Sequence, residues 1–164
     1  LDQMIAVVTA DEGVAGTLLT YDNLETAWTM GAETSARVRA GDLLSVGLGY
    51  TFTATRDGEN DRELEGRARH RPTASATLTW DEAEVDVTAR SAVQVGRVFF
   101  LDEDGDGAEE RVVADPLAQL DLRVAKRFGR HVEIFAGVDN VLGAGDRFTV
   151  FRPRVFYAGA RGRY

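Results

Sequence analysis

The stretch that decides the fold is LLSVGLGYTFTA, residues 43–54. Its even positions are apolar and carry Leu44, Val46, Leu48, Tyr50, Phe52 and Ala54. The odd positions from 45 to 53 carry only serine, glycine and threonine. Successive side chains of a β-strand point to opposite faces, so this alternation with a period of two indicates a strand. We predict a strand with one apolar face and one small, polar face.

The same alternation recurs along most of the chain, and helical periodicity is hard to find. It predicts about eight strands, most of them longer than the roughly 5–6 residues of an ordinary strand. The seven further predicted strands are residues 1–10, 28–39, 73–80, 85–98, 117–128, 132–142 and 154–164.

The predicted connections alternate between short and long. The short turns are residues 40–42, 81–83 and 129–131, and the long polar loops are residues 11–16, 57–71, 102–115 and 143–153. No helical crossover of the kind that joins parallel strands is evident. The pattern predicts an all-β, antiparallel, up-and-down meander with two unlike ends, as in transmembrane β-barrels.

Alternation by itself does not say which face meets a protein core. A soluble β-sandwich or a lipocalin-like barrel buries the apolar face, whereas a membrane barrel turns it to lipid. Strands of about 9–12 residues suit a tilted crossing of the hydrocarbon. Polar faces that mix charged and small residues suit a wet lumen. Aromatic residues near strand ends suit interfacial girdles, and these residues are Trp28, Trp80, Phe128 and Tyr164.

Composition narrows the classes of function. The 164 residues carry 27 acidic and 19 basic side chains, a net charge of −8, which argues against a nucleic-acid partner. The absence of cysteine excludes disulfides and thiolate metal sites. Ser91 and the other serines lack a nucleophile elbow, so acyl-transfer chemistry has no support. Nothing else in the sequence suggests an enzyme. We expect Leu1 to be a processed or truncated start, because the chain begins without methionine.

Residues 102–110, DEDGDGAEE, form the sharpest local motif. Asp102, Asp104 and Asp106, followed by glycine, resemble the opening of a calcium loop. The twelfth loop position is Val113 instead of a glutamate, so the alternative of a solvated acidic loop stays open. No other cofactor is expected. His131 is expected to be solvated in a short turn. His70 is expected to be a solvated loop base, with a ligand contact as the alternative.

Several motifs, in order along the chain, carry a resemblance to a known family. They are YDNLETAWTMGAETSARV (21–38), LLSVGLGYTFTATRD (43–57), LEGRARHRP (64–72), VEIFAGVDNVLGAGDRF (132–148) and PRVFYAGARGRY (153–164). Together they resemble the later barrel strands of TonB-dependent outer-membrane receptors. The resemblance implies that residues 1–164 are the C-terminal part of a larger, 22-stranded transmembrane barrel, without its plug domain.

The resemblance also implies a function and partners in the bacterial outer membrane. The expected role is uptake of a scarce nutrient such as a ferric siderophore, cobalamin or a glycan, a small molecule or metal chelate. TonB would act through a plug domain that is not in this chain. The expected surroundings are outer-membrane lipid and lipopolysaccharide. The alternatives are a stand-alone eight-stranded barrel with a structural or adhesive role, and a soluble β-sandwich binding module.

Two sets of residues receive roles from this resemblance. The last strand would close the barrel and be read by the barrel-assembly machinery, with Phe156, Ala158, Ala160 and Tyr164 facing lipid. Charged residues on the opposite faces would line the lumen. The lumen-facing set is Glu33, Arg37, Arg39, Arg90, Arg123, Arg161 and Arg163.

Overall fold

The computed structural model describes residues 4–10, 18–24, 26–148 and 153–162. Over this part the chain is all-β, with one short 3-10 turn, η1 (Asp81–Ala83). The strands are β1 (Met4–Ala10), β2 (Leu18–Leu24), β3 (Ala27–Ala40), β4 (Leu44–Asp57), β5 (His70–Trp80), β6 (Val85–Gln94), β7 (Val98–Leu101), β8 (Glu110–Val113), β9 (Leu117–Phe128), β10 (Val132–Asp139) and β11 (Val155–Gly162). Within the described residues, no helix is long and apolar enough to cross a bilayer.

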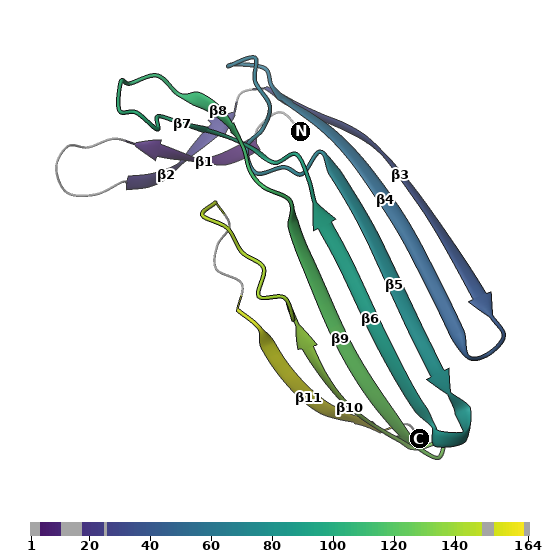
Figure 1. Cartoon of the computed structure of the whole chain (residues 1–164). Coiled ribbons are helices and arrows are strands. Elements are labelled where there is room, and N and C mark those ends of the chain that lie inside the picture. Colours follow the sequence, from purple (N-terminus) through teal and green to yellow (C-terminus); the bar gives the residue numbers. More distant parts are fainter. Residues whose placement is uncertain (1–3, 11–17, 25, 149–152, 163–164) are drawn as a thin grey trace.

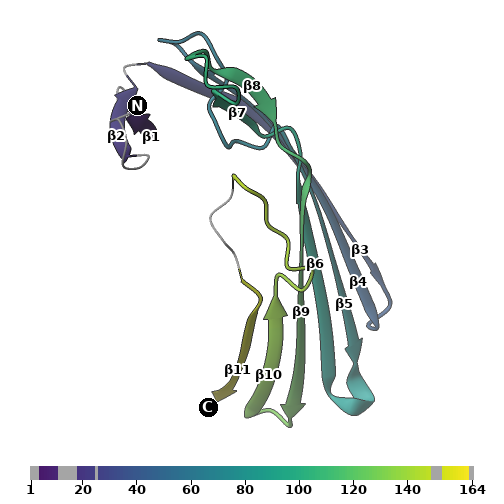
Figure 2. The same cartoon turned by 60° about the vertical axis from the view of Figure 1, so that its left-hand side comes forward.

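Seven of these strands form one antiparallel sheet in the order β11-β10-β9-β6-β5-β4-β3. Strands that follow one another in this sheet are neighbours, and the β7–β8 hairpin is an insertion between β6 and β9. The meander predicted from the sequence is therefore confirmed. The sheet is a single curved layer, with β3 and β11 at its two edges (Figures 1 and 2).

The ends of the sheet differ as predicted. Three short turns lie at one end, near the end of β11, and the long connections lie at the other (Figure 1). The first turn contains Gly41, whose φ of +59° is a left-handed conformation that favours glycine. The β7–β8 hairpin rises from the end with long connections (Figure 1).

Strand pairing brings the apolar positions onto one face of the sheet, called the apolar face below. One row of paired residues crosses all seven strands, and it reads Val38, Val46, Ala76, Ala89, Leu122, Val138 and Phe156. The neighbouring row faces the other way and contains Arg37, Gly47, Ser75, Arg90 and Asp121. This opposite surface is called the polar face.

Exposure is inverted relative to a water-soluble protein. On β9, Leu122, Val124 and Phe128 of the apolar face are 38%, 48% and 53% exposed. The residues between them on the polar face are half-buried or buried. The buried apolar side chains of the described part are only Val98, Ala114, Leu117 and Ala125. A continuous exposed apolar surface marks contact with a membrane or a partner instead of a globular core.

Several element boundaries differ from those predicted. Residues 85–98 do not form one strand, because Gly96 has a φ of +71° and the chain turns there between β6 and β7. The predicted loop 102–115 contains β8, which pairs with β7. The described part also contains β2, which the alternation did not predict.

The start of β5 was also predicted too late in the chain. This strand begins at His70, so the predicted loop 57–71 ends earlier than expected. Its pairing with β6 starts at Thr73, with a separate bridge between His70 and Val95. Pro72 lies between these two sites, and its missing N–H accounts for the gap in the ladder.

Candidate functional site

The polar face holds the charged residues that the sequence assigned to a lumen. Glu33, Arg37 and Arg39 lie on β3, and the rest of the set that the structure describes is Arg90 on β6, Arg123 on β9 and Arg161 on β11. The pairing registers place all of them on the same face. Phe156, Ala158 and Ala160 point to the apolar face. Arg163 and Tyr164 lie outside the described residues.

Ion pairs tie neighbouring strands together near the short turns. Arg123 on β9 donates to Glu133 on β10 at 2.8 Å. Arg127 lies 3.2 Å from Asp86 on β6 and 3.5 Å from Asp81. Both arginine side chains are more than one-third exposed, so each pair contributes at most about 1 kcal/mol. These pairs therefore contribute little to the stability of the sheet.

Two aromatic rings on the polar face lie against glycines of the adjacent strand. Phe135 pairs with Gly159, and Gly137 pairs with Tyr157. A Cβ atom at Gly137 would be 2.4 Å from the Tyr157 ring, and one at Gly159 would be 2.6 Å from the Phe135 ring. The Arg123 guanidinium lies 4.6 Å from the Phe135 ring centroid.

Sequence reasoning overlooked Phe135, although a signal was present. The triplets Phe-Ala-Gly (135–137) and Tyr-Ala-Gly (157–159) place an aromatic residue two positions before a glycine in each strand. In an antiparallel pair, this spacing sets each ring opposite the other strand's glycine.

Three connecting segments meet at the end of the sheet opposite the short turns, and we call them the loop cluster. They are residues 57–70, 95–117 and 140–148. Glu63 accepts from Arg69 at 2.7 Å and from Arg111 on β8 at 2.6 Å. The Phe100 amide donates to the Glu65 carboxylate at 3.0 Å. These contacts hold the β7–β8 hairpin to the first segment.

Arg97 joins the second and third segments and was not predicted from the sequence. It is 3% exposed, forms an ion pair with Asp146, and donates to the Asp115 carbonyl at 3.0 Å. Beside it, the Phe99 and Phe148 rings stack with centroids 4.3 Å apart.

Asn140, in the motif of residues 132–148, shapes the turn that follows β10. Asn140 is 3% exposed and has a φ of +53°. Its side-chain oxygen accepts a hydrogen bond from the Ala144 backbone amide at 2.9 Å, and its backbone amide donates to the Asp121 carboxylate at 2.8 Å. This turn directs the chain from β10 into the third segment of the loop cluster.

Asp57 anchors the beginning of the loop cluster. It is the last of the 14 residues of β4, beyond the roughly 9–11 that a tilted strand needs to cross a bilayer. Burial opposes the charged form of Asp57. Hydrogen bonds from the Asn60 side chain and from the amides of Glu59 and Asn60, together with the charge of Arg62, outweigh burial and lower the pKa of this carboxyl.

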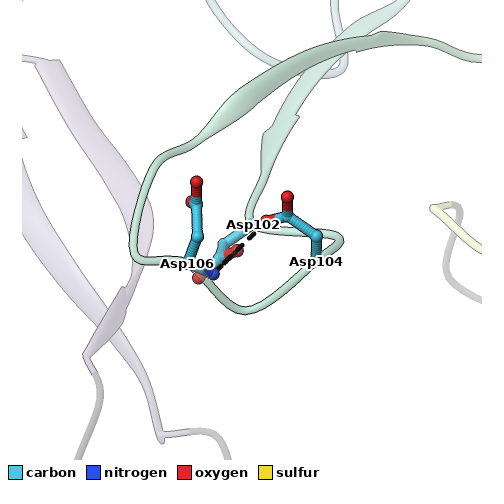
Figure 3. A group of neighbouring side chains, drawn as sticks. All are labelled: Asp102, Asp104 and Asp106. Carbon is cyan, nitrogen blue, oxygen red and sulfur yellow. Dashed lines mark hydrogen bonds between the residues drawn. The ribbon is translucent and has the colours of Figure 1, made fainter.

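The acidic motif forms an exposed loop between β7 and β8. Figure 3 shows Asp102, Asp104 and Asp106. One carboxylate oxygen of each residue lies within 4.8 Å of one oxygen of each of the other two. Asp102 already accepts from the amides of Gly105 and Gly107, at 2.7 and 2.9 Å. Three carboxylates at this spacing could hold a hard cation. The twelfth position, Val113, lies on β8 and offers no carboxylate.

The two histidines have different surroundings. His131 is exposed in the turn between β9 and β10. The prediction of a solvated loop base at His70 is wrong, because His70 begins β5 on the apolar face and is half-buried. Its Nδ1 lies 2.7 Å from the Tyr50 hydroxyl, and its ring centroid is 5.6 Å from that of Phe52.

Comparisons with known proteins agree with this geometry. Residues 1–141 match the family model described as TonB dependent receptor-like, beta-barrel. A search of curated proteins finds no match.

Three solved structures share the fold at low sequence identity. Two are structures of the Pseudomonas aeruginosa receptor FpvA, bound to a heterologous pyoverdine (TM-score 0.61, 13% identity) and to ferripyoverdine (0.60, 14%). The third is the Escherichia coli outer membrane transporter YddB (0.61, 13%). The matches cover 94%, 92% and 97% of this chain and 22%, 21% and 28% of those chains. The chain therefore spans between about a fifth and three-tenths of their length.

Proposed function

We propose that this chain serves nutrient uptake across the bacterial outer membrane, because it belongs to the TonB-dependent receptor β-barrel family. The matched structures are of receptors and transporters, not enzymes. In this proposal residues 1–164 form part of the wall of a larger transmembrane barrel. The apolar face contacts lipid, and the polar face lines the lumen.

One observation carries the proposal. Across the described sheet, many large apolar side chains are exposed, including Trp28 at 47%, Trp80 at 59% and Phe156 at 75%. Exposure of such a surface to water costs a free energy of roughly 25 cal/mol for each Å² of apolar area. Hydrocarbon removes this penalty, whereas the mixed charges of the polar face suit a wet interior.

The ends of the apolar face fit the same arrangement. Trp28 lies near the long connections, and Trp80 lies near the short turns. Aromatic rings prefer the two boundaries between lipid and water. Lys126 lies on the apolar face of β9, and its ammonium donates a hydrogen bond to the Ala83 carbonyl in the short turn. A lysine that reaches the boundary in this way avoids burying its charge in hydrocarbon.

The substrate of this proposal is a scarce nutrient such as a ferric siderophore, taken up with energy from TonB through a plug domain outside this chain. Support comes from the two FpvA structures, which hold a pyoverdine and ferripyoverdine. The loop cluster would form part of the capture surface. Its exposed arginines and acidic groups offer polar contacts, and Phe99, Phe100 and Phe148 offer rings that are partly exposed.

β11 would close the barrel and carry the signal for the barrel-assembly machinery. In the sheet described, its outer edge has no neighbouring strand. An unpaired strand edge is a liability in lipid, so pairing with the first strand of the complete barrel would satisfy its backbone groups. Outer-membrane lipid and lipopolysaccharide would surround the finished wall.

A deletion strain tests the proposal. We expect loss of the gene to abolish uptake of one radiolabelled nutrient from a panel of ferric siderophores, cobalamin and glycans. Plasmid complementation should restore uptake, but not in a strain that also lacks TonB. Unchanged uptake of the whole panel, with the folded protein in the aqueous fraction without detergent, would refute the proposal.

A further inference from the structure

The polar face contains a hollow of about 390 Å³ between β3 and β6. Its floor consists of small residues on β4, β5 and β6, and its sides are arginines. The floor includes Ser45, Ser75, Thr77 and Thr88, and the sides are Arg37 and Arg39 on β3 and Arg90 on β6.

Strand register explains why the hollow is open. Arg37 pairs with Gly47, Gly47 with Ser75, and Ser75 with Arg90. The two arginines thus stand at the ends of a row three strand spacings long, about 14 Å at 4.7–4.9 Å each. A Cβ atom at Gly47 would lie 2.7 Å from Ser75 Oγ and 3.8 Å from Arg37 Nε. Glycine therefore leaves room on the floor beneath the Arg37 side chain.

The charge of this hollow is not balanced within the described chain. Among the described residues, Arg37, Arg39 and Arg90 form no ion pair, although acidic residues outnumber basic ones by 27 to 19. Arginines nearby do find carboxylates, as Arg123 does with Glu133. Asp42 is the one acidic residue that lines the hollow, and it too forms no ion pair in the described part.

The chemistry of these side chains selects a ligand class. A guanidinium presents a planar fork of N–H donors that matches a carboxylate with two parallel hydrogen bonds. Serine and threonine hydroxyls on the floor add further donors. We propose that the hollow is a carboxylate-binding site, with Arg37 and Arg90 closing on the ligand from opposite sides.

The carboxylate has two sources, a free carboxylate molecule or acidic side chains of this protein outside residues 1–164. Both present the same group to the same arginines. The inference does not depend on which nutrient is transported.

Chemical modification of the full-length protein in detergent tests the site and separates the two sources. Phenylglyoxal modifies accessible arginines, and mass spectrometry follows each arginine-containing peptide. Arg130 is the internal control, because it is exposed in the β9–β10 turn and forms no ion pair among the described residues. Citrate, added at millimolar concentration, is the free-carboxylate probe.

Two results support the proposal. A free ligand is indicated when citrate slows modification of Arg37, Arg39 and Arg90 at least threefold but leaves Arg130 unchanged. An internal carboxylate is indicated when these three react at least tenfold more slowly than Arg130 without citrate, and when R37Q/R90Q lowers the melting temperature more than R130Q. The single variant R90Q serves the same comparison if the double variant does not fold.

Two results would overturn it. One is modification of all three arginines as fast as Arg130, with and without citrate. The other is slow modification that citrate does not change, combined with an R37Q/R90Q melting temperature equal to that of R130Q. In the second case the arginines are only covered, not bound to a carboxylate.

Discussion

Two glycines, one in β10 and one in β11, make room for aromatic rings of the paired strand. Gly137 and Gly159 each receive an aromatic ring from the adjacent strand, and the two contacts are reciprocal. Glycine weakens a strand because it lacks a side chain to pack, so a covering ring compensates for that loss. The contacts also fix the register, since a slip of one residue would move both rings off their glycines.

This arrangement predicts that G137A destabilises the protein. The new Cβ atom would lie 2.4 Å from the Tyr157 ring and 2.8 Å from the Leu122 carbonyl, so both the ring and the backbone must move. Overpacking of this kind costs about 1–3 kcal/mol. Urea unfolding in detergent should show the loss. G162A is the matched control, because no described atom lies within 4 Å of its new Cβ. Equal midpoints for the two variants would contradict the account.

Asp57 makes the loop cluster sensitive to acid. Its pKa is lowered in the folded protein, so its stabilising effect is complete above the pKa of the unfolded chain, about 3.9. The effect is lost as pH falls from there through the lowered folded pKa. We expect the amide protection factors of residues 58–62, which are corrected for the intrinsic exchange rate at each pH, to fall in that acidic range in the wild type. D57N should remove this pH dependence, whereas the exposed-site control D104N should retain it. A pH-independent wild type would refute the assignment.

Among the structural elements, the β7–β8 hairpin depends on side chains from another segment. Its strands have only four residues each, and a two-stranded hairpin is marginal by itself. Glu63 is central because it accepts from both Arg69 and Arg111. These groups are partly exposed, so each pair is worth at most about 1 kcal/mol and is weakened by salt.

We therefore predict that E63Q loosens the hairpin without unfolding the sheet. Protease cleavage within residues 102–109 should accelerate severalfold, and high salt should produce a similar increase in the wild type. E59Q is the control, because the Glu59 side chain is exposed and forms no ion pair within the described chain. Identical cleavage rates for E63Q and E59Q would show that the ion pairs do not hold the hairpin.

The acidic loop of the same hairpin carries the predicted calcium site. Asp102, Asp104 and Asp106 gather three carboxylates on a glycine-containing loop, and the predicted ligand is calcium. Binding would slow cleavage of residues 102–109, and D104N should weaken that protection. Calorimetry that detects no heat with calcium, in a protein whose cleavage calcium does not slow, would exclude the site.

The elements that the sequence predicted well are those whose order comes from local alternation. β3, β4, β9 and β10 were located because every second residue is apolar, and that pattern needs no knowledge of neighbours. β8 was overlooked because its four residues are ordered by pairing with β7 and by Arg111, which meets Glu63 far away in the sequence. For the same reason, the buried ion pair of Arg97 with Asp146 could not be inferred.

At the scale of the whole molecule, sequence alternation specified two faces but left their surroundings open. The structure resolves part of this question, because the described strands form a single layer and the apolar face stays exposed. Which arginines lack an ion pair among the described residues depends on strand register, and so the hollow between Arg37 and Arg90 could not be predicted from the sequence. The family match then favours hydrocarbon as the medium outside.

Hydrocarbon against the apolar face predicts a large asymmetry between two substitutions on one strand. Leu122 and Gln119 both lie on β9, on the apolar and polar faces respectively. An arginine at the lipid midplane costs about 2–4 kcal/mol, whereas the lumen side tolerates charge. We expect L122R to reduce folding of the full-length protein into phosphatidylcholine vesicles strongly, and Q119R to fold nearly as well as the wild type. Gel mobility with and without heating measures the folded fraction. Equal folding of the two variants would mean that a protein surface or water, not lipid, covers the apolar face.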